Sequence, residues 1–99
     1  MSGIFEVEII SPDKTIFKSK VIETIIPSYE GEMGILKDHI SLITFLRPGI
    51  ISIKNSDEKK YFVEEGTVEF SKNNLLILSS SAKDLSSMSK KFINEMLGQ

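Results

Sequence analysis

The chain has 99 residues and a formal net charge of −2, and its composition is 40% hydrophobic and 26% charged. This length and balance are typical of one soluble globular domain and exclude a disordered chain. Because the sequence has no cysteine and a single histidine, it excludes a disulfide framework and disfavours a zinc site.

The first third of the chain predicts strands. Apolar and acidic residues alternate from Ile4 to Ile10, which is typical of a strand with one buried face. A turn at residues 11–14 and a short apolar piece at 16–17 lead to a second alternating strand from Val21 to Ile26. Pro27 is expected to end that strand, because proline has no N–H group for the ladder.

The next segment combines turn residues with a strongly apolar run. Residues 28–34, Ser-Tyr-Glu-Gly-Glu-Met-Gly, are predicted to form a loop whose glycines let the backbone bend. A short strand at residues 35–36 and a turn at 37–39 follow. Ile40 to Leu46 is almost continuously apolar, which predicts a central strand covered on both faces.

The remaining residues predict two hairpins and a helix. Strands Ile50–Lys54 and Tyr61–Glu64 flank a polar tip, and strands Thr67–Phe70 and Leu75–Leu78 flank a turn with two asparagines. After Asp84, a candidate N-cap, the apolar spacing becomes that of a helix over residues 85–97. Fifteen isoleucines against a single alanine also favour β structure. We therefore expect a sandwich or barrel of nine or ten strands in residues 1–84, followed by one helix.

Residues 30–49 contain the only histidine and are the best place to look for a site. An enzyme using Glu30, Glu32 and His39 is disfavoured, because nothing around the two carboxylates in sequence suggests the desolvated setting of acid–base catalysis. The stretch Gly-Glu-Met-Gly lacks the Lys-Ser/Thr pair of a phosphate loop. The residues alone thus indicate a protein-interaction module and leave its partner open.

Two other classes of partner are disfavoured by charge and hydropathy. Acidic and basic residues are interspersed, so the sequence has no basic patch for nucleic acid or anionic lipid. An oligonucleotide-binding barrel would also need interleaved aromatic residues, and the chain has two tyrosines and no tryptophan. No apolar run approaches the ~20 residues of a membrane-spanning helix. We expect no nucleic acid partner and no direct membrane insertion.

The run GEMGILKDHISLITFLRPG resembles the amino-terminal domain of the epsilon subunits of F-type ATP synthases. In that family a Gly-Glu-x-Gly-Ile-x-x-x-His stretch precedes an apolar strand and a Pro-Gly turn. The flanking residues 7–17 and 61–82 are also similar to the family, so the resemblance covers about 85 residues in total. The matching positions here are Gly31, Glu32, Gly34, Ile35 and His39, followed by Pro48 and Gly49.

The resemblance implies a flattened sandwich of ten strands that acts as a non-catalytic rotor subunit of the central stalk. Such a subunit couples the gamma subunit to the membrane c ring during rotary ATP synthesis and lies on the cytoplasmic face of the bacterial plasma membrane. It implies no cofactor and no metal. The residues that it assigns to the c ring are Glu30, Gly31, Glu32, Met33 and Gly34, and those that it assigns to gamma are His39, Ile40 and Leu42.

This sequence departs from the family pattern at three places. Lys37-Asp38 stands where the family often has Pro-Gly, and Glu64-Glu65-Gly66 stands where it often has Ser-Gly-Gly. Many members also continue into an inhibitory two-helix hairpin, whereas we expect a single helix over residues 85–97 packed on or beside the sandwich, and hence no braking by helix insertion. The alternative to the rotor subunit is a stand-alone β-sandwich interaction module outside the ATP synthase.

Overall fold

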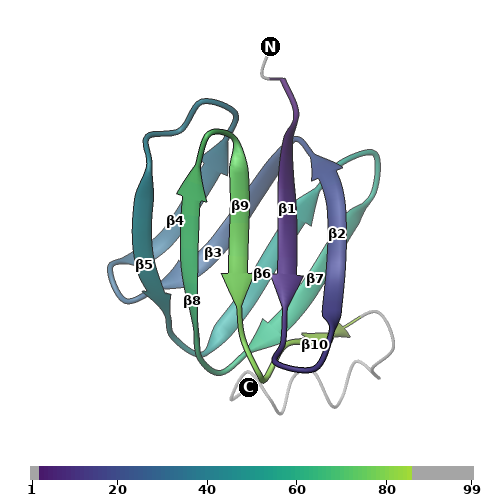
Figure 1. Cartoon of the computed structure of the whole chain (residues 1–99), viewed down its shortest axis with the longest axis vertical. Coiled ribbons are helices and arrows are strands. Elements are labelled where there is room, and N and C mark those ends of the chain that lie inside the picture. The colour runs from purple at the N-terminus through teal and green to yellow at the C-terminus, as the bar shows by residue number, and fades with distance from the viewer. Residues whose placement is uncertain (1–2, 86–99) are drawn as a thin grey trace.

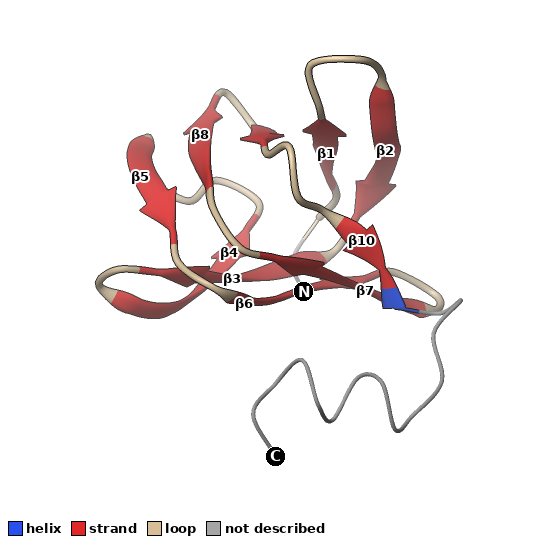
Figure 2. Cartoon of the chain, turned by 90° about the horizontal axis from the view of Figure 1, so that it is seen from below, coloured by secondary structure: helices blue, strands red, loops and turns tan. Residues whose placement is uncertain are grey.

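In the computed structural model, which describes residues 3–85, the chain forms ten β-strands that fold into two layers (Figure 1). The strands are β1 (Phe5–Ile10), β2 (Thr15–Val21), β3 (Glu23–Ser28), β4 (Gly31–Leu36), β5 (Leu42–Leu46), β6 (Gly49–Lys54), β7 (Glu58–Val63), β8 (Gly66–Ser71), β9 (Asn74–Leu78) and β10 (Lys83–Asp84). The predicted all-β fold of about ten short strands is confirmed. Figure 2 shows the layers from below.

One continuous sheet makes both layers. Its strand order is β10-β7-β6-β3-β5-β8-β9-β1-β2, with β4 paired to β3 beside this path. In Figure 1 the front layer contains β5, β8, β9, β1 and β2, and β3, β4, β6 and β7 lie behind it. The layers are joined where Ser28 of β3 pairs with Leu46 of β5. All neighbours are antiparallel except β1 and β9, which are parallel.

The hydrophobic core lies between the two layers. On β1, Phe5, Val7 and Ile9 are 3%, 0% and 0% exposed, as the alternation in the sequence predicted. The ring of Phe5 meets that of Phe70 edge-on, with centroids 5.7 Å apart. Each fully buried aliphatic or aromatic side chain stabilises the fold by about 1.5–3 kcal/mol. The other core residues include Val21, Ile26, Ile35, Leu46, Ile51, Ile53, Tyr61, Val63, Val68, Leu75 and Ile77.

Aromatic rings close the gap between β2 and β7, which belong to opposite layers. The ring centroids of Phe17 and Tyr61 lie 5.7 Å apart, and the ammonium of Lys59 lies 5.8 Å from each. Lys59 Nζ is also 3.0 Å from Oδ2 of Asp84 in β10. The hydrogen bond to Asp84 raises the pKa of Lys59, and burial raises the pKa of Tyr61.

The predicted loop at residues 28–34 is wrong, because this segment forms most of a tight hairpin. Strand β3 continues through Pro27 to Ser28, and β4 begins at Gly31. Pro27 is tolerated because it lies opposite Glu32 and its carbonyl accepts a hydrogen bond from Arg47 N at 3.0 Å. The carbonyl of Pro27 thus faces away from β4. On that side of β3, the pairing with β6 has already ended at Ile25.

One further boundary and the burial of one strand differ from those predicted. The break between β2 and β3 falls at Ile22, so residues 18–20 lie inside β2 rather than before a strand. Strand β5 is not covered on both faces as expected, because its outward residues Ile43 and Phe45 are 76% and 61% exposed. The polar and glycine turns around the two later hairpins were predicted close to their observed positions.

The described chain ends at the edge of the back layer. Strand β10 pairs with β7, so that Asp84 lies opposite Tyr61. Leu85 follows and is 7% exposed. The helix predicted over residues 85–97 lies, from residue 86 onward, outside the described residues.

Candidate partner-binding surface

The tip of the β3–β4 hairpin contains the five residues that the resemblance assigns to the c ring, Glu30 to Gly34. Ser28 Oγ accepts a hydrogen bond from Glu30 N at 3.2 Å and donates one to the carbonyl of Gly31 at 2.7 Å. Gly31 has φ +113°, a conformation that side-chain-bearing residues rarely adopt. These local interactions define the turn, and they explain why serine and glycine bracket Tyr29 and Glu30.

The tip residues differ in what they present to solvent. Glu30 and Glu32 are exposed, whereas Met33 is half-buried and packs against the core. Gly34 is exposed. It is not one of the described residues with positive φ, so the bend expected at this glycine is not found. The sequence therefore placed the two carboxylates correctly at an accessible site, but only Gly31 has a conformation that requires glycine.

The hairpin tip is attached to β5 of the front layer. Tyr29 N donates to the carbonyl of Phe45 at 3.3 Å, and Thr44 Oγ1 donates to Glu30 Oε1 at 2.9 Å. Thr44 itself is 7% exposed. The carboxylate of Glu30 is thus held by Thr44, fourteen residues further along the chain, while Glu32 is exposed on β4, opposite Pro27 of β3.

The residues assigned to gamma by the resemblance lie in the β4–β5 loop and at the start of β5. The ring of His39 packs edge-on against Phe70, with centroids 5.9 Å apart. Ile40 is 79% exposed. Leu42 is half-buried and packs against the core, so its side chain faces away from the outer surface. Of the three, Ile40 offers the most accessible apolar side chain.

The outer face of the front layer carries apolar residues that the sequence analysis missed. Phe45, Thr67 and Leu78 lie side by side on β5, β8 and β9, and Ile43 lies two residues before Phe45. We call Tyr29, Ile43, Phe45 and Leu78, which are 71%, 76%, 61% and 45% exposed, the apolar surface. The continuous apolar run in β5 concealed it, because such a run does not indicate which alternate residues face solvent.

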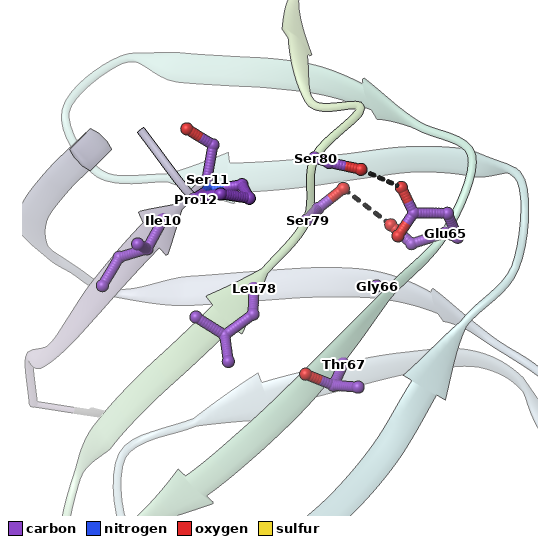
Figure 3. A pocket seen from close by; sticks show the side chains of 9 residues that line it. All are labelled: Ile10, Ser11, Pro12, Glu65, Gly66, Thr67, Leu78, Ser79 and Ser80. Carbon is purple, nitrogen blue, oxygen red and sulfur yellow. Dashed lines mark hydrogen bonds between the residues drawn. The ribbon is translucent and has the colours of Figure 1, made fainter. Parts of the chain in front are cut away.

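Two shallow hollows border the apolar surface and meet at Gly66. One, of about 570 Å³, lies at the ends of β1, β8 and β9 and is shown in Figure 3. Its polar side contains Glu65, which accepts hydrogen bonds from Ser80 Oγ to its carboxylate at 2.8 Å and from Ser79 Oγ to its carbonyl at 2.6 Å. The other, of about 320 Å³, is lined by residues that include Tyr29 and Phe45. Hollows of this kind accommodate projecting side chains of a protein partner better than a flat face does.

A metal-binding cluster is not found in residues 3–85. This part of the chain holds no group of three or more histidine, cysteine or carboxylate residues placed to bind a metal ion. In the same residues, no helix has the length and hydropathy to cross a membrane. The arrangement that remains is an apolar face beside an acidic hairpin tip, which is chemically suited to protein–protein contact.

A family model described as the ATP synthase delta/epsilon chain, β-sandwich domain, matches residues 4–84. The chain therefore belongs to the delta/epsilon chain family of ATP synthase. The ATP synthase epsilon chain of Pelagibacter ubique is 50% identical over 101 residues, which cover 100% of this chain and 78% of that relative. The epsilon chain of Dichelobacter nodosus is 35% identical over 97 residues, with 96% and 68% covered. The resemblance to epsilon subunits is thus confirmed, and the stand-alone module is not favoured.

Solved structures show the same fold in more distant proteins. A chain of the Euglena gracilis mitochondrial ATP synthase superposes with a TM-score of 0.80 at 23% identity, covering 93% of this chain and 60% of that one. A chain from the central stalk and c-ring structure of the Tetrahymena thermophila enzyme gives a TM-score of 0.69 at 15% identity, with 94% and 87% covered.

Proposed function

We propose that the chain is a non-catalytic rotor subunit of a proton-translocating F-type ATP synthase, in which it couples the gamma subunit to the c ring. The match of the family model over residues 4–84 carries this proposal. The complex would hold the subunit peripherally at the cytoplasmic face of a bacterial plasma membrane. The subunit itself transmits rotation and contributes no catalytic group.

The surface for gamma comprises Ile40 and the apolar surface. The apolar side chains of Ile43 and Phe45 are largely exposed to water, which is unfavourable. Their burial against a partner gives a favourable free energy of roughly 25 cal/mol per Å² of buried apolar surface, before the costs of association are subtracted. His39 and Leu42 support this surface from beneath, since both side chains pack inward. These observations support a contact with gamma on the outer side of β5.

The surface for the c ring is the hairpin tip from Glu30 to Gly34. Glu32 is its accessible charged group, and it fits a partner loop that presents arginine or lysine, because charge-assisted hydrogen bonds resist displacement better than apolar contact. Met33 and Gly34 follow Glu32 in β4. Since Glu30 is bonded to Thr44, we assign the direct ring contact chiefly to Glu32.

The proposal is tested by mixing the purified chain with the gamma subunit from the same source and then with the c ring, and following co-elution on gel filtration. Phe45→Ala should weaken gamma binding by tenfold or more, as aromatic anchors at interfaces commonly do. Leu36→Ala is the matched control, because Leu36 is 43% exposed on the other layer. A wild-type chain that never co-elutes with gamma would refute the proposal.

A charge reversal tests the ring contact separately. Glu32→Lys should weaken attachment of the gamma-bound chain to the c ring and leave its β-sheet circular dichroism unchanged. Asp57→Lys makes the same change of charge in the β6–β7 turn, away from the β3–β4 tip (Figure 1), and should have little effect. Equal effects of the two variants would contradict a specific contact at Glu32.

A further inference from the structure

Two side chains from turns far apart in sequence form a reciprocal clamp. The backbone N–H of Asp38 donates to Asn73 Oδ1 at 2.7 Å, and Asn73 Nδ2 donates to Asp38 Oδ1 at 3.1 Å. Asp38 lies in the β4–β5 loop and Asn73 in the β8–β9 turn, 35 positions later. The pair therefore fixes the loop to the front layer at a point where no strand pairing does so within the described residues.

Both residues of the clamp have a left-handed backbone. The φ angles are 67° at Asp38 and 60° at Asn73, a region that asparagine and aspartate tolerate better than most residues but still visit at a cost. The two hydrogen bonds offset that cost. The carbonyl of Asn73 also accepts a hydrogen bond from Glu6 N at 3.0 Å, so the clamp rests on β1 as well.

The clamp determines where the next two residues lie. His39 N donates to the carbonyl of Leu36 at 3.1 Å, which closes the turn around Asp38. The ring of His39 then lies edge-on against Phe70, and Ile40 follows with 79% of its surface exposed. An isoleucine so exposed has little packing of its own to hold it, so its position depends on the loop that precedes it.

We propose that Asp38 and Asn73 are positioning residues, which preorganise the β4–β5 loop so that Ile40 is presented in the conformation that the gamma subunit binds. This inference rests on the proposed function, since it takes the gamma surface as given. Preorganisation strengthens binding because a loop that is already ordered loses less conformational entropy on association. Neither residue needs to touch gamma for this effect.

The test measures the dissociation constant for purified gamma by calorimetry with four chains and one control variant. The four chains are the wild type, Asn73→Gly, Ile40→Ala and the double variant. Glycine keeps the left-handed turn accessible while it removes both hydrogen bonds of the clamp. We expect Asn73→Gly to weaken binding about tenfold, the size of effect that two hydrogen bonds of ordinary strength can control. Lys72→Gly is the matched control, because Lys72 has φ 52° in the same turn.

The double variant separates positioning from general destabilisation. If the clamp acts through Ile40, then Ile40→Ala should weaken binding strongly in the wild type and only slightly in the Asn73→Gly chain. Independent, additive effects would overturn the inference while leaving the gamma surface intact, as would a Lys72→Gly chain that loses as much affinity as Asn73→Gly. A wild-type chain that does not bind gamma would overturn both the proposed function and this inference, so the two failures are distinguishable.

Discussion

The hydroxyl of Thr44 donates a hydrogen bond to the carboxylate of Glu30 across 2.9 Å, and it thereby joins the outward-facing strand β5 to the tip of the β3–β4 hairpin. Backbone hydrogen bonds from Tyr29 N to Phe45 O and from Arg47 N to Pro27 O flank this side-chain bond. The proposed ring contact and the proposed gamma contact are therefore neighbours on one rigid unit. Force applied to one reaches the other without passing through a flexible linker.

Replacing Thr44 by valine should loosen the hairpin tip without unfolding the protein. Valine keeps the shape and burial of threonine but cannot donate, and the exposed Glu30 carboxylate can turn to water instead. We expect the unfolding free energy to change by less than about 1 kcal/mol. Amide hydrogen exchange at Glu30 should become faster in Thr44→Val and remain slow in Thr44→Ser, which keeps the hydroxyl. Equal exchange in the two variants would show that the hydroxyl does not hold the tip.

The two glycines of the hairpin should respond differently to alanine. At Gly31 the obstacle is the backbone, because φ is +113° although the space for a Cβ is open. We expect Gly31→Ala to lower the unfolding free energy by about 1–3 kcal/mol. At Gly34 a Cβ would lie 3.7 Å from Glu23 Oε2, an ordinary contact. Gly34→Ala should change stability by less than about 0.5 kcal/mol or increase it, and urea titration of both variants would reveal a reversed order.

Thr24 should tolerate valine with a gain in stability. Its side chain is 0% exposed, between Ile35 of β4 and Ile53 of β6, and its hydroxyl has no hydrogen-bond partner within the described part of the chain. A buried hydroxyl without a partner costs roughly 1–3 kcal/mol relative to an apolar group of the same shape. We expect Thr24→Val to raise the unfolding free energy by about 1 kcal/mol. A loss of stability in urea titration would indicate a bond to this hydroxyl.

Stability should decline in alkaline solution because of the cluster between β2 and β7. Burial raises the pKa of Tyr61 above its ordinary value of 10.0, and the hydrogen bond to Asp84 raises the pKa of Lys59 above 10.5. Both groups keep their protons to higher pH when folded than when unfolded. Their contribution is therefore complete below about pH 10 and is lost as the pH rises through the folded pKa values.

Urea midpoints measured between pH 8 and pH 11 would test this alkaline decline. Tyr61→Phe should make the decline less steep, since phenylalanine does not titrate. Tyr29→Phe, which leaves Tyr61 as the single tyrosine, should retain the decline and allow Tyr61 ionisation to be followed by ultraviolet absorbance. A decline of equal steepness in Tyr61→Phe would assign it to other groups.

Much of the fold could be predicted because period-two alternation is strong in this chain. Phe5, Val7 and Ile9 are buried as their spacing indicated, and the asparagine-containing turn gave the β8–β9 hairpin. The errors arose where tertiary context prevailed over local rules. Proline could enter β3 because the neighbouring ladder ends beside it, and this cannot be inferred from the proline itself.

The partner assignments of the candidate site stay predictions. The carboxylates at the hairpin tip and Ile40 lie at exposed positions. The outward face of β5 was missed because every residue from Leu42 to Leu46 except Thr44 is apolar, so the pattern does not separate Ile43 and Phe45 from their buried neighbours. The Asp38–Asn73 clamp was also missed, since no local pattern links positions 35 residues apart.

The parallel pairing of β1 with β9 has a consequence for biosynthesis. Residues Glu6 to Ile10 align with Asn74 to Leu78, so β1 leaves the ribosome well before β9 and has to wait for it before both of its edges are paired. Such distant pairing slows folding to the range of milliseconds to seconds typical of sandwiches. Until residue 78 has emerged, the unpaired edge of β1 in a growing chain can therefore pair with other chains. A chaperone or prompt assembly is most useful to the cell during that interval.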